Sequence, residues 1–277
     1  MAARLPERWR RALELASRLG YAARGAVYLT VGVLAMLAAL DLTPSASGAH
    51  EAMALWARWT PGLLLVALLA GCLLAFSVWR GVQSVFDADR HGRSPRALAI
   101  RAGQAVSGLA YGALAVSALE LLDGFEDIGE ADESESARTA AAEILALPHG
   151  DGLLVAAGLG LVAVGVGNFI QGVGQDFAKR LDGSRALCRW AVPLARAGYV
   201  GRGLATLPLG LFLLRAGWQV RAAEARSWAD ALDAVEGQPF GSLIVVLIAL
   251  GLIAFGLFGV VEARYRRIVP PRNLSPG

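Results

Sequence analysis

The segment Arg18-Leu19-Gly20-Tyr21-Ala22-Ala23-Arg24-Gly25 organises the whole chain, because its pattern returns twice. Residues 196–203 repeat both arginines, the tyrosine and two glycines at the same spacing. Residues 101–108 carry a degraded copy, in which Gln104 and Ser107 replace the tyrosine and the second arginine. Each copy opens an apolar run long enough to cross a membrane. The pattern therefore predicts three tandem two-helix repeats, at about residues 20–90, 101–182 and 196–268.

Composition indicates a membrane protein. Hydrophobic residues make up 56% of the chain and charged residues only 18%, and the mean hydropathy is +0.51, values outside the range of soluble domains. About 20 apolar residues cross a bilayer as a helix, in which every backbone polar group finds an internal partner. We therefore expect an all-α, six-helix polytopic membrane bundle in a single integral membrane domain, residues 1–277, with spans at Tyr21 to Leu40, Pro61 to Trp79, Gly103 to Leu122, Gly152 to Gln171, Gly198 to Leu214 and Gly241 to Val261.

Short amphipathic segments lie outside these spans. Residues 1–19 have the spacing of an interfacial helix, which we expect to lie on the membrane surface before the chain turns inward at Gly20. Three segments between the two spans of a repeat predict small surface helices: Met53 to Trp59, Ala137 to Leu147 and Trp228 to Val235. The second span of each repeat then begins at a proline followed by glycine: Pro61-Gly62, Pro148-His149-Gly150 and Pro239-Phe240-Gly241.

Basic residues predict the orientation, since they accumulate on the cytoplasmic side of a membrane. Of the 26 lysine and arginine residues, 21 fall on one predicted side, within residues 4–24, 80–101, 179–202 and 264–272. The acidic segment from Glu120 to Glu135 falls on the other side. We therefore expect a multi-pass protein of the inner (cytoplasmic) membrane with both termini in the cytoplasm and its arginines near anionic lipid headgroups.

The repeated glycine-tyrosine and arginine-glycine pairs, the proline-glycine starts and the closing Glu262-Ala263-Arg264-Tyr265-Arg266-Arg267 resemble a known family. It is a bacterial family of integral membrane proteins of unknown function, made of three tandem two-helix transmembrane repeats. The resemblance covers about residues 14–268 and is weakest in the middle repeat, where Gln104 and Ser107 depart from the pattern. It implies a fold and a membrane location, and it carries no activity.

Polar residues within the spans are the candidate functional residues, because ionisable groups at membrane depth are costly and usually face an interior or a cavity. We place Arg24 and Arg202 one turn inside their helices, and Arg80, Gln171 and Glu262 at matching places in the second helices. One interpretation is snorkelling of the arginines with pairing of Glu262 to Arg24 or Arg202; the other is a solute or ion gate. The predicted polar layer is Arg24, Arg80, Asn168, Gln171, Arg202 and Glu262, with Asn168 one turn deeper than Gln171.

Glycines within the spans predict close helix packing. Small residues allow helix backbones to approach in a membrane, either within one bundle or between two copies of the chain. Pro208 inside the fifth span predicts a kink, because proline removes a helical hydrogen bond. The candidate packing positions are Gly25, Gly108, Gly112 and Gly203, with Gly158, Gly160, Gly165 and Gly167 in the fourth span.

Several functional classes find no support in the sequence. Two cysteines and three scattered histidines predict neither a disulfide nor a metal site. Catalytic and nucleotide-binding motifs are missing, so we expect no enzymatic activity, no cofactor and no nucleic-acid partner. Two hypotheses remain: a structural or partner-binding membrane component whose protein partner is unidentified, or alternatively a small-solute or ion permeation protein.

The predicted topology is testable by cysteine labelling. A cysteine at Ser134, in the acidic segment, should react with a membrane-impermeant reagent in intact cells, and a cysteine at Ser94, in a basic loop, should not. The reverse pattern would overturn the orientation.

Overall fold

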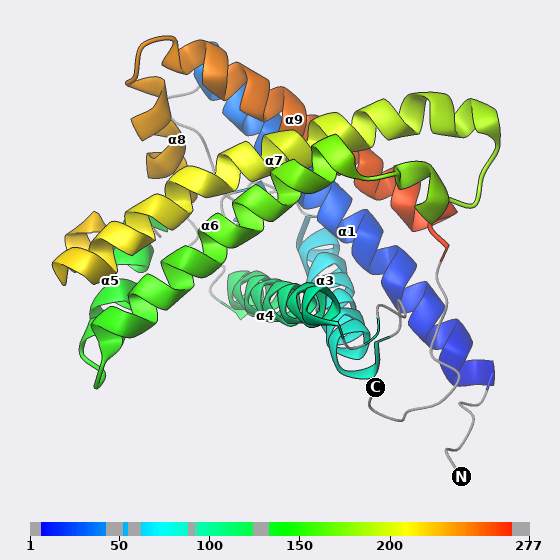
Figure 1. The fold of residues 1–277 in the computed structure, drawn as a ribbon, viewed down its shortest axis with the longest axis horizontal. Helices are drawn as coiled ribbons and strands as arrows, with labels where there is room; N and C mark the ends of the chain where they lie inside the picture. The colour runs from blue at the N-terminus through cyan, green and yellow to red at the C-terminus, as the bar shows by residue number, and fades with distance from the viewer. Residues whose placement is uncertain are drawn as a thin grey trace.

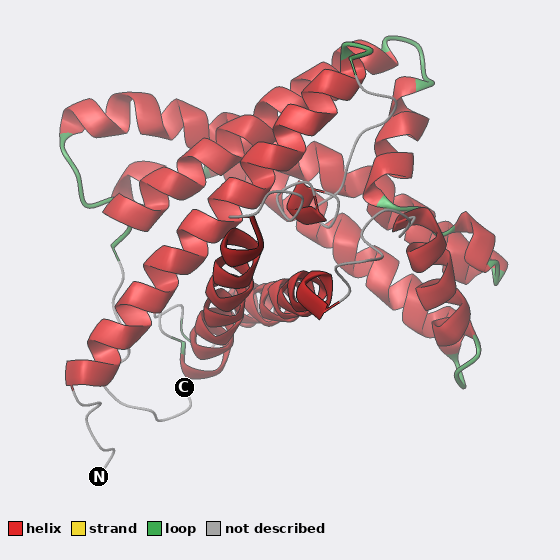
Figure 2. Cartoon of the chain, turned by 180° about the vertical axis from the view of Figure 1, so that it is seen from behind, coloured by secondary structure: helices red, strands yellow, loops and turns green. Residues whose placement is uncertain are grey.

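The computed structural model describes residues 7–42, 52–54, 62–87, 92, 94–123 and 133–267. Six helices in this part are long and apolar enough to cross a membrane. Figure 2 shows helices and connecting loops and no strand among the described residues, so the prediction of an all-α multi-pass membrane protein is confirmed. The long helices are α1 (Glu7–Ala39), α3 (Gly62–Phe86), α4 (Pro95–Asp123), α6 (Gly150–Gly174), α7 (Arg185–Gln219) and α9 (Gly241–Tyr265). The short helices are α5 (Glu133–Leu145), α8 (Trp228–Glu236) and the 3-10 turns η1 (Phe177–Arg180) and η2 (Ala222–Glu224).

The first helix of each repeat is longer than expected. Helix α1 runs unbroken through Gly20, so the turn predicted at this residue is wrong, and the amphipathic segment before it continues the first membrane helix. Ion pairs one helical turn apart stabilise this extension, Glu7 with Arg11 at 2.5 Å and Glu14 with Arg18 at 2.8 Å. Helix α7 likewise begins ahead of its predicted span and continues through Pro208 to its end.

The short helices expected at Ala137 to Leu147 and Trp228 to Val235 are present as α5 and α8. The third, Met53 to Trp59, lies mostly outside the described residues. After α5 and α8 the chain turns through His149 and Phe240, both in the left-handed conformation (φ 60° and 63°). Glycine must follow in each case, because a side chain there would collide with the last carbonyl groups of the short helix.

Three antiparallel pairs contain the most extensive helix contacts: α1 with α9, α3 with α4, and α6 with α7. Figure 1 shows α6 and α7 lying side by side across the molecule, while α4 is seen end-on next to α3. Each pair joins the first helix of one repeat to the second helix of the preceding repeat. The pair of α1 and α9 closes this series, because it joins the first repeat to the last. The repeat of the sequence is therefore not the packing unit of the fold.

Equivalent glycines form the centre of all three pairs. A Cβ on Gly25 would lie 2.8 Å from the carbonyl oxygen of Gly256, and one on Gly203 would lie 2.7 Å from that of Gly165. In the α3/α4 pair, a Cβ on Gly108 would lie 3.3 Å from the Ser77 carbonyl oxygen. The backbones thus meet at one repeated position, which only a residue without a side chain can occupy closely.

This contact corrects the predicted register of the second helices. The contact aligns Ser77 of α3 with Gly165 of α6 and Gly256 of α9. The same alignment also superposes the first residues of these three helices. Gln83 then matches Gln171 and Glu262, so the expectation that Arg80 occupies this place is wrong. Arg80 lies one turn earlier, at the position of Asn168 and Gly259.

Helices α6 and α7 form the longest glycine interface. Glycines recur at every seventh residue on both helices, and this spacing keeps them on one helix face. A Cβ on Gly158 would lie 2.6 Å from the Leu214 amide nitrogen, and one on Gly217 would lie 2.7 Å from the Val155 nitrogen. The contacting glycines are Gly158, Gly165 and Gly172 on α6 and Gly203, Gly210 and Gly217 on α7.

Among the described helices, the two helices of one repeat pack together in the first and last repeats only. Gly20 of α1 faces Phe76 of α3, and Gly198 of α7 faces Phe255 of α9 in the same way. The equivalent glycine of the middle repeat is Gly103, and a Cβ at this residue would meet no described atom within 4 Å. Helices α4 and α6 therefore lack the interface that their counterparts share.

Missing aromatic side chains explain this opening. Helix α6 carries Val164 where α3 and α9 carry phenylalanine, and Gly167 where they carry Trp79 and Phe258. Trp79 and Phe258 are almost fully buried, and each large side chain supplies extensive contact area between helices. We call the uncovered surface the α4–α6 seam, defined by Gly103, Val106 and Ser107 on α4 and Gly160, Val164 and Gly167 on α6.

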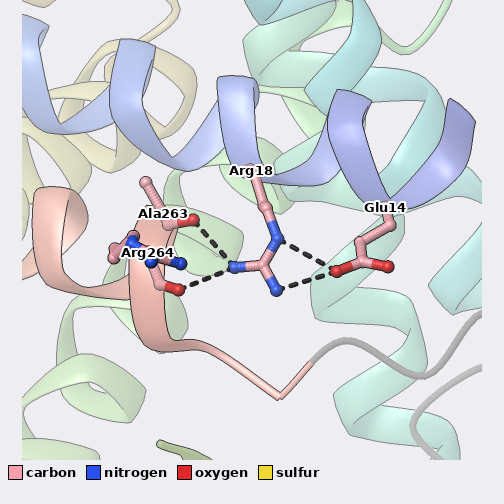
Figure 3. Close-up of polar contacts among 4 residues, drawn as sticks. All are labelled: Glu14, Arg18, Ala263 and Arg264. Carbon is pink, nitrogen blue, oxygen red and sulfur yellow. Dashed lines mark hydrogen bonds and ion pairs between the residues drawn. The ribbon is translucent and has the colours of Figure 1, made fainter. Parts of the chain in front are cut away.

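In two of the three helix pairs, an arginine of the first helix binds the C-terminal end of the second helix. The Arg18 guanidinium donates to the carbonyls of Ala263 and Arg264 at 3.0 and 2.9 Å and is oriented by Glu14 (Figure 3). In the α3/α4 pair, Arg101 donates to the equivalent carbonyls of α3 at 2.7 and 2.9 Å. A cation at a helix C-terminus satisfies unpaired carbonyls and complements the helix dipole. This role accounts for the first arginine of the pattern in the first two copies, Arg18 and Arg101.

Substituting glycines on opposite faces of α6 tests the packing. Gly165→Leu should lower the free energy of unfolding by about 3 kcal/mol or more, because the side chain would meet the α7 backbone. Gly160→Leu is the matched control, since nothing lies within 4 Å of a Cβ at Gly160. Thermal unfolding in detergent measures the difference. Equal stability of the two variants would refute glycine contact as the basis of the α6/α7 pair.

Candidate functional site

The predicted polar layer lies deeper along the first helices than expected. Because α1 and α7 extend back to residues 7 and 185, Arg24 and Arg202 lie near the midpoints of these helices rather than one turn from an end. Arg80 and Glu262 lie near the C-terminal ends of α3 and α9. The antiparallel packing of α1 on α9 brings Arg24 and Glu262 to the same level.

Glu262 is the acidic centre of the site. Its Oε2 atom accepts a hydrogen bond from Arg24 Nη2 at 2.5 Å, and both side chains are 1% exposed. Its other oxygen pairs with Arg266, one helical turn along α9. The structure thus joins Glu262 to Arg24, which was one of the two predicted partners, and not to Arg202. Each partner raises the cost of removing the other, since a lone charge would remain buried.

Aromatic rings link neighbouring guanidinium groups. Arg80 and Arg24 both contact the ring of Phe76, at 5.1 and 5.6 Å from its centroid. Arg24 and Arg202 both contact Phe255, at 4.7 and 4.9 Å. Such contacts stabilise each cation by about 0.5 to 2 kcal/mol. Phe76 and Phe255, which lie between the two helices of the first and last repeats, therefore also contact the arginines.

Tyrosine side chains also contact these arginines. Tyr21 contacts both Arg24 and Arg266, at 5.1 and 4.7 Å, while Tyr28 contacts Arg202 at 5.1 Å. Tyr111 of α4 packs edge-on against Phe76 with a centroid distance of 5.0 Å. The site thus draws side chains from α1, α3, α4, α7 and α9.

Asn168 and Gln171 lie apart from this site. Both belong to α6, where Asn168 is 6% exposed and its amide nitrogen has no hydrogen-bond partner in the described part of the chain. Among the described contacts, none joins either residue to Arg24, Arg80 or Arg202. Asn168 and Gln171, which were predicted to belong to the polar layer, are therefore not joined to its arginines by any described contact.

Most of the candidate packing glycines lie in the helix pairs, but a Cβ on Gly160 or Gly167 would meet nothing within 4 Å, so the packing predicted for these two is wrong. Gly25, Gly108 and Gly203 occupy the equivalent central contacts described above, and Gly112 faces the hydroxyl of Ser77. This hydroxyl also donates a hydrogen bond to the Gly108 carbonyl at 2.7 Å. In the α3/α4 pair a side-chain hydrogen bond thus replaces one of the glycines found in the other two pairs.

Sequence reasoning missed the aromatic side chains and Arg266. Both have a signal in the chain. Residues 75–79 and 254–258 each begin with Ala-Phe and end with a large aromatic residue, an internal match that identifies Phe76 and Phe255 as equivalent. Arg266 stands four residues after Glu262, the spacing of an ion pair on one helix face.

Metal-ligating groups do not gather in the described part of the chain, which holds no cluster of three histidine, cysteine or acidic side chains. Cys72 is buried in α3 and Cys188 lies in the first turn of α7, and both are free thiols.

Comparison with known proteins finds a match for each of the three repeats. Residues 19–87, 102–175 and 197–266 each match one family, described as Domain of Unknown Function (DUF1206). The uncharacterized protein YxxB of Bacillus subtilis (strain 168) is 30% identical over 257 residues, which cover 91% of this chain and 90% of that protein. No solved structure matches the chain.

A double-mutant cycle tests the acidic centre. Glu262→Gln should destabilise the protein by about 3 to 5 kcal/mol, because Arg24 would keep a buried charge without its partner. Combined with Arg24→Gln, the cost should be clearly smaller than the sum of the single effects. Arg202→Gln is the control and should add independently, since Arg202 makes no ion pair with Glu262. Coupling to Arg202 instead of Arg24 would contradict the observed pairing.

Proposed function

The chain belongs to the DUF1206 family, and from its own geometry we propose that it is a structural, partner-binding component of the cytoplasmic membrane and not an enzyme. The observation that carries this proposal is the α4–α6 seam. The first and last repeats fill the equivalent interface with their own aromatic side chains, and the middle repeat leaves it uncovered.

Charge distribution supports a defined orientation in that membrane. The chain ends and the loops joining α3 to α4 and α6 to α7 carry most of the basic residues, which favours their placement in the cytoplasm. The basic residues there would contact anionic lipid headgroups. Helices α5 and α8 then lie on the outer side.

The proposed occupant of the seam is a transmembrane helix of another membrane protein. Small residues at Gly103, Gly160 and Gly167 would admit a second backbone at close range. The seam lacks the aromatic volume that Phe76 and Phe255 supply in the other two repeats, so the incoming helix should present large side chains at this level. The seam continues an interface used twice within the molecule, which argues for a helix rather than a lipid chain as the occupant.

Permeation receives less support from the geometry. A path across the membrane needs a continuous row of polar groups. Asn168 and Gln171 are the polar residues near the C-terminal end of α6, and they are separate from the arginine site. The glycine contacts of the three pairs close the space between backbones.

Photocrosslinking tests the proposed docking position. A photoreactive phenylalanine derivative at Gly103 or Gly167 should form a crosslink in intact membranes to one transmembrane segment, which mass spectrometry identifies. A probe placed within that segment should return a crosslink to α4 or α6. Leu109 is the control position on α4, because it is 76% exposed and lies outside the seam.

Three results would contradict this proposal: crosslinks from both positions to lipid alone, to the opposite seam helix of the same chain, or to a second copy. The second result would show that α4 and α6 close on each other. The third would replace a foreign partner by self-association.

A further inference from the structure

We propose that the arginine site binds a phosphate-type oxyanion, held by Arg24, Arg80, Arg202 and Tyr111. Arg24 and Arg266 pair with the carboxylate of Glu262, while Arg80 and Arg202 share the rings of Phe76 and Phe255 with Arg24. In the described part of the chain, no acidic side chain contacts Arg80 or Arg202. The site therefore carries an excess of positive charge.

Glu262 cannot balance this charge. Its two oxygens are already engaged by Arg24 and Arg266. Cation–π contacts with Phe76 and Phe255 contribute only about 0.5 to 2 kcal/mol each, and the half-buried Arg80 and Arg202 have no counter-charge in the described part of the chain. An anion would satisfy the remaining guanidinium groups.

Unpaired hydrogen-bond donors point to the same ligand. Several buried polar atoms of the site have no partner among the described residues, and every one of them can donate a hydrogen bond. A ligand that satisfies a group of unpaired donors must supply hydrogen-bond acceptors. These atoms are Tyr21 Oη, Arg24 Nε, Arg80 Nε, Tyr111 Oη and Arg202 Nε.

Tyr111 lies next to two of these arginines. Its ring packs on Phe76 at 5.0 Å, Arg24 and Arg80 contact the same ring, and its buried hydroxyl has no partner among the described residues. Arg80 and Arg202 are partly exposed, while Arg24 is sealed, so the anion would enter past the former two and reach the Tyr111 hydroxyl. The planar fork of arginine matches the oxygen geometry of phosphate.

The phosphate has two possible sources, a phospholipid headgroup or a free phosphate in the cytoplasm. Arg80 lies close to the C-terminal end of α3, near the predicted level of the headgroups. Both sources present the same tetrahedral oxyanion to the site.

Ligand-dependent thermal unfolding of the purified full chain in neutral detergent tests the site. Sodium phosphate at constant ionic strength, and separately phosphatidylglycerol with phosphatidylcholine as its zwitterionic counterpart, would be titrated. One of the two anions should raise the unfolding temperature of the parent protein in a saturable way. Saturation by inorganic phosphate assigns a free anion, and saturation by phosphatidylglycerol alone assigns a lipid headgroup.

Two variants identify the residues. Tyr111→Phe removes one donor without changing charge or ring packing, and Arg202→Gln removes one guanidinium group. Each should weaken the apparent affinity roughly tenfold or more, the effect of one lost hydrogen bond to a charged group. The controls are Tyr199→Phe, whose ring packs on Phe255, and Arg215→Gln, an exposed arginine in the last turns of α7.

If Arg202→Gln fails to fold, Tyr111→Phe still decides the outcome. The proposal is overturned if neither anion gives saturable stabilisation, or if Tyr111→Phe responds as the parent does. Neither measurement depends on a protein partner, so the result is independent of the crosslinks expected at the α4–α6 seam.

Discussion

Backbone contact at one repeated glycine position is the constraint on which the structure depends. Gly25, Gly108 and Gly203 each face a carbonyl of the second helix of the preceding repeat. A membrane offers little hydrophobic driving force between helices, so close packing of small residues must hold the pairs together. Because the same contact joins α1 to α9, the first and last helices of the chain are tied together. This closure brings Arg24 beside Glu262, and the buried ion pair follows from it.

The middle repeat shows how small changes at packing positions open a repeat array. Valine and glycine replace two large aromatic residues in α6, and Gln104 and Ser107 replace tyrosine and arginine in α4. The first change removes the side chains that would hold α4 against α6, while the glycine contact of α4 on α3 is retained. Contact between neighbouring repeats therefore persists without contact between the two helices of one repeat. The middle repeat has lost only the contact between its own two helices. The arginine site is formed mainly by the two repeats that kept their aromatic residues.

Much of the candidate site was predictable, and the errors have identifiable causes. Charge and depth predicted that Glu262 pairs with Arg24 or Arg202, and the structure selects Arg24. The position of Arg80 was misjudged because the second helices were aligned by their polar residues. Aligning the first residues of these helices instead places Arg80 one turn earlier. The turn at Gly20 was wrong because a glycine was taken as a break, whereas it serves as the contact for Phe76. Arg266 was overlooked although its spacing from Glu262 indicated an ion pair.

Six membrane helices, three repeats and the surface helices α5 and α8 could be predicted from the chain, because hydropathy, periodicity and turn residues are local properties. Which helices pair, that α1 closes on α9 and that α4 stands apart from α6 were decided only by the tertiary structure. These outcomes depend on whether a glycine on one helix meets backbone, an aromatic ring or nothing on a helix far away in the sequence. The grouping of the arginines is of the same kind, since it arises only when distant helices bring Arg24, Arg80 and Arg202 to the rings of Phe76 and Phe255.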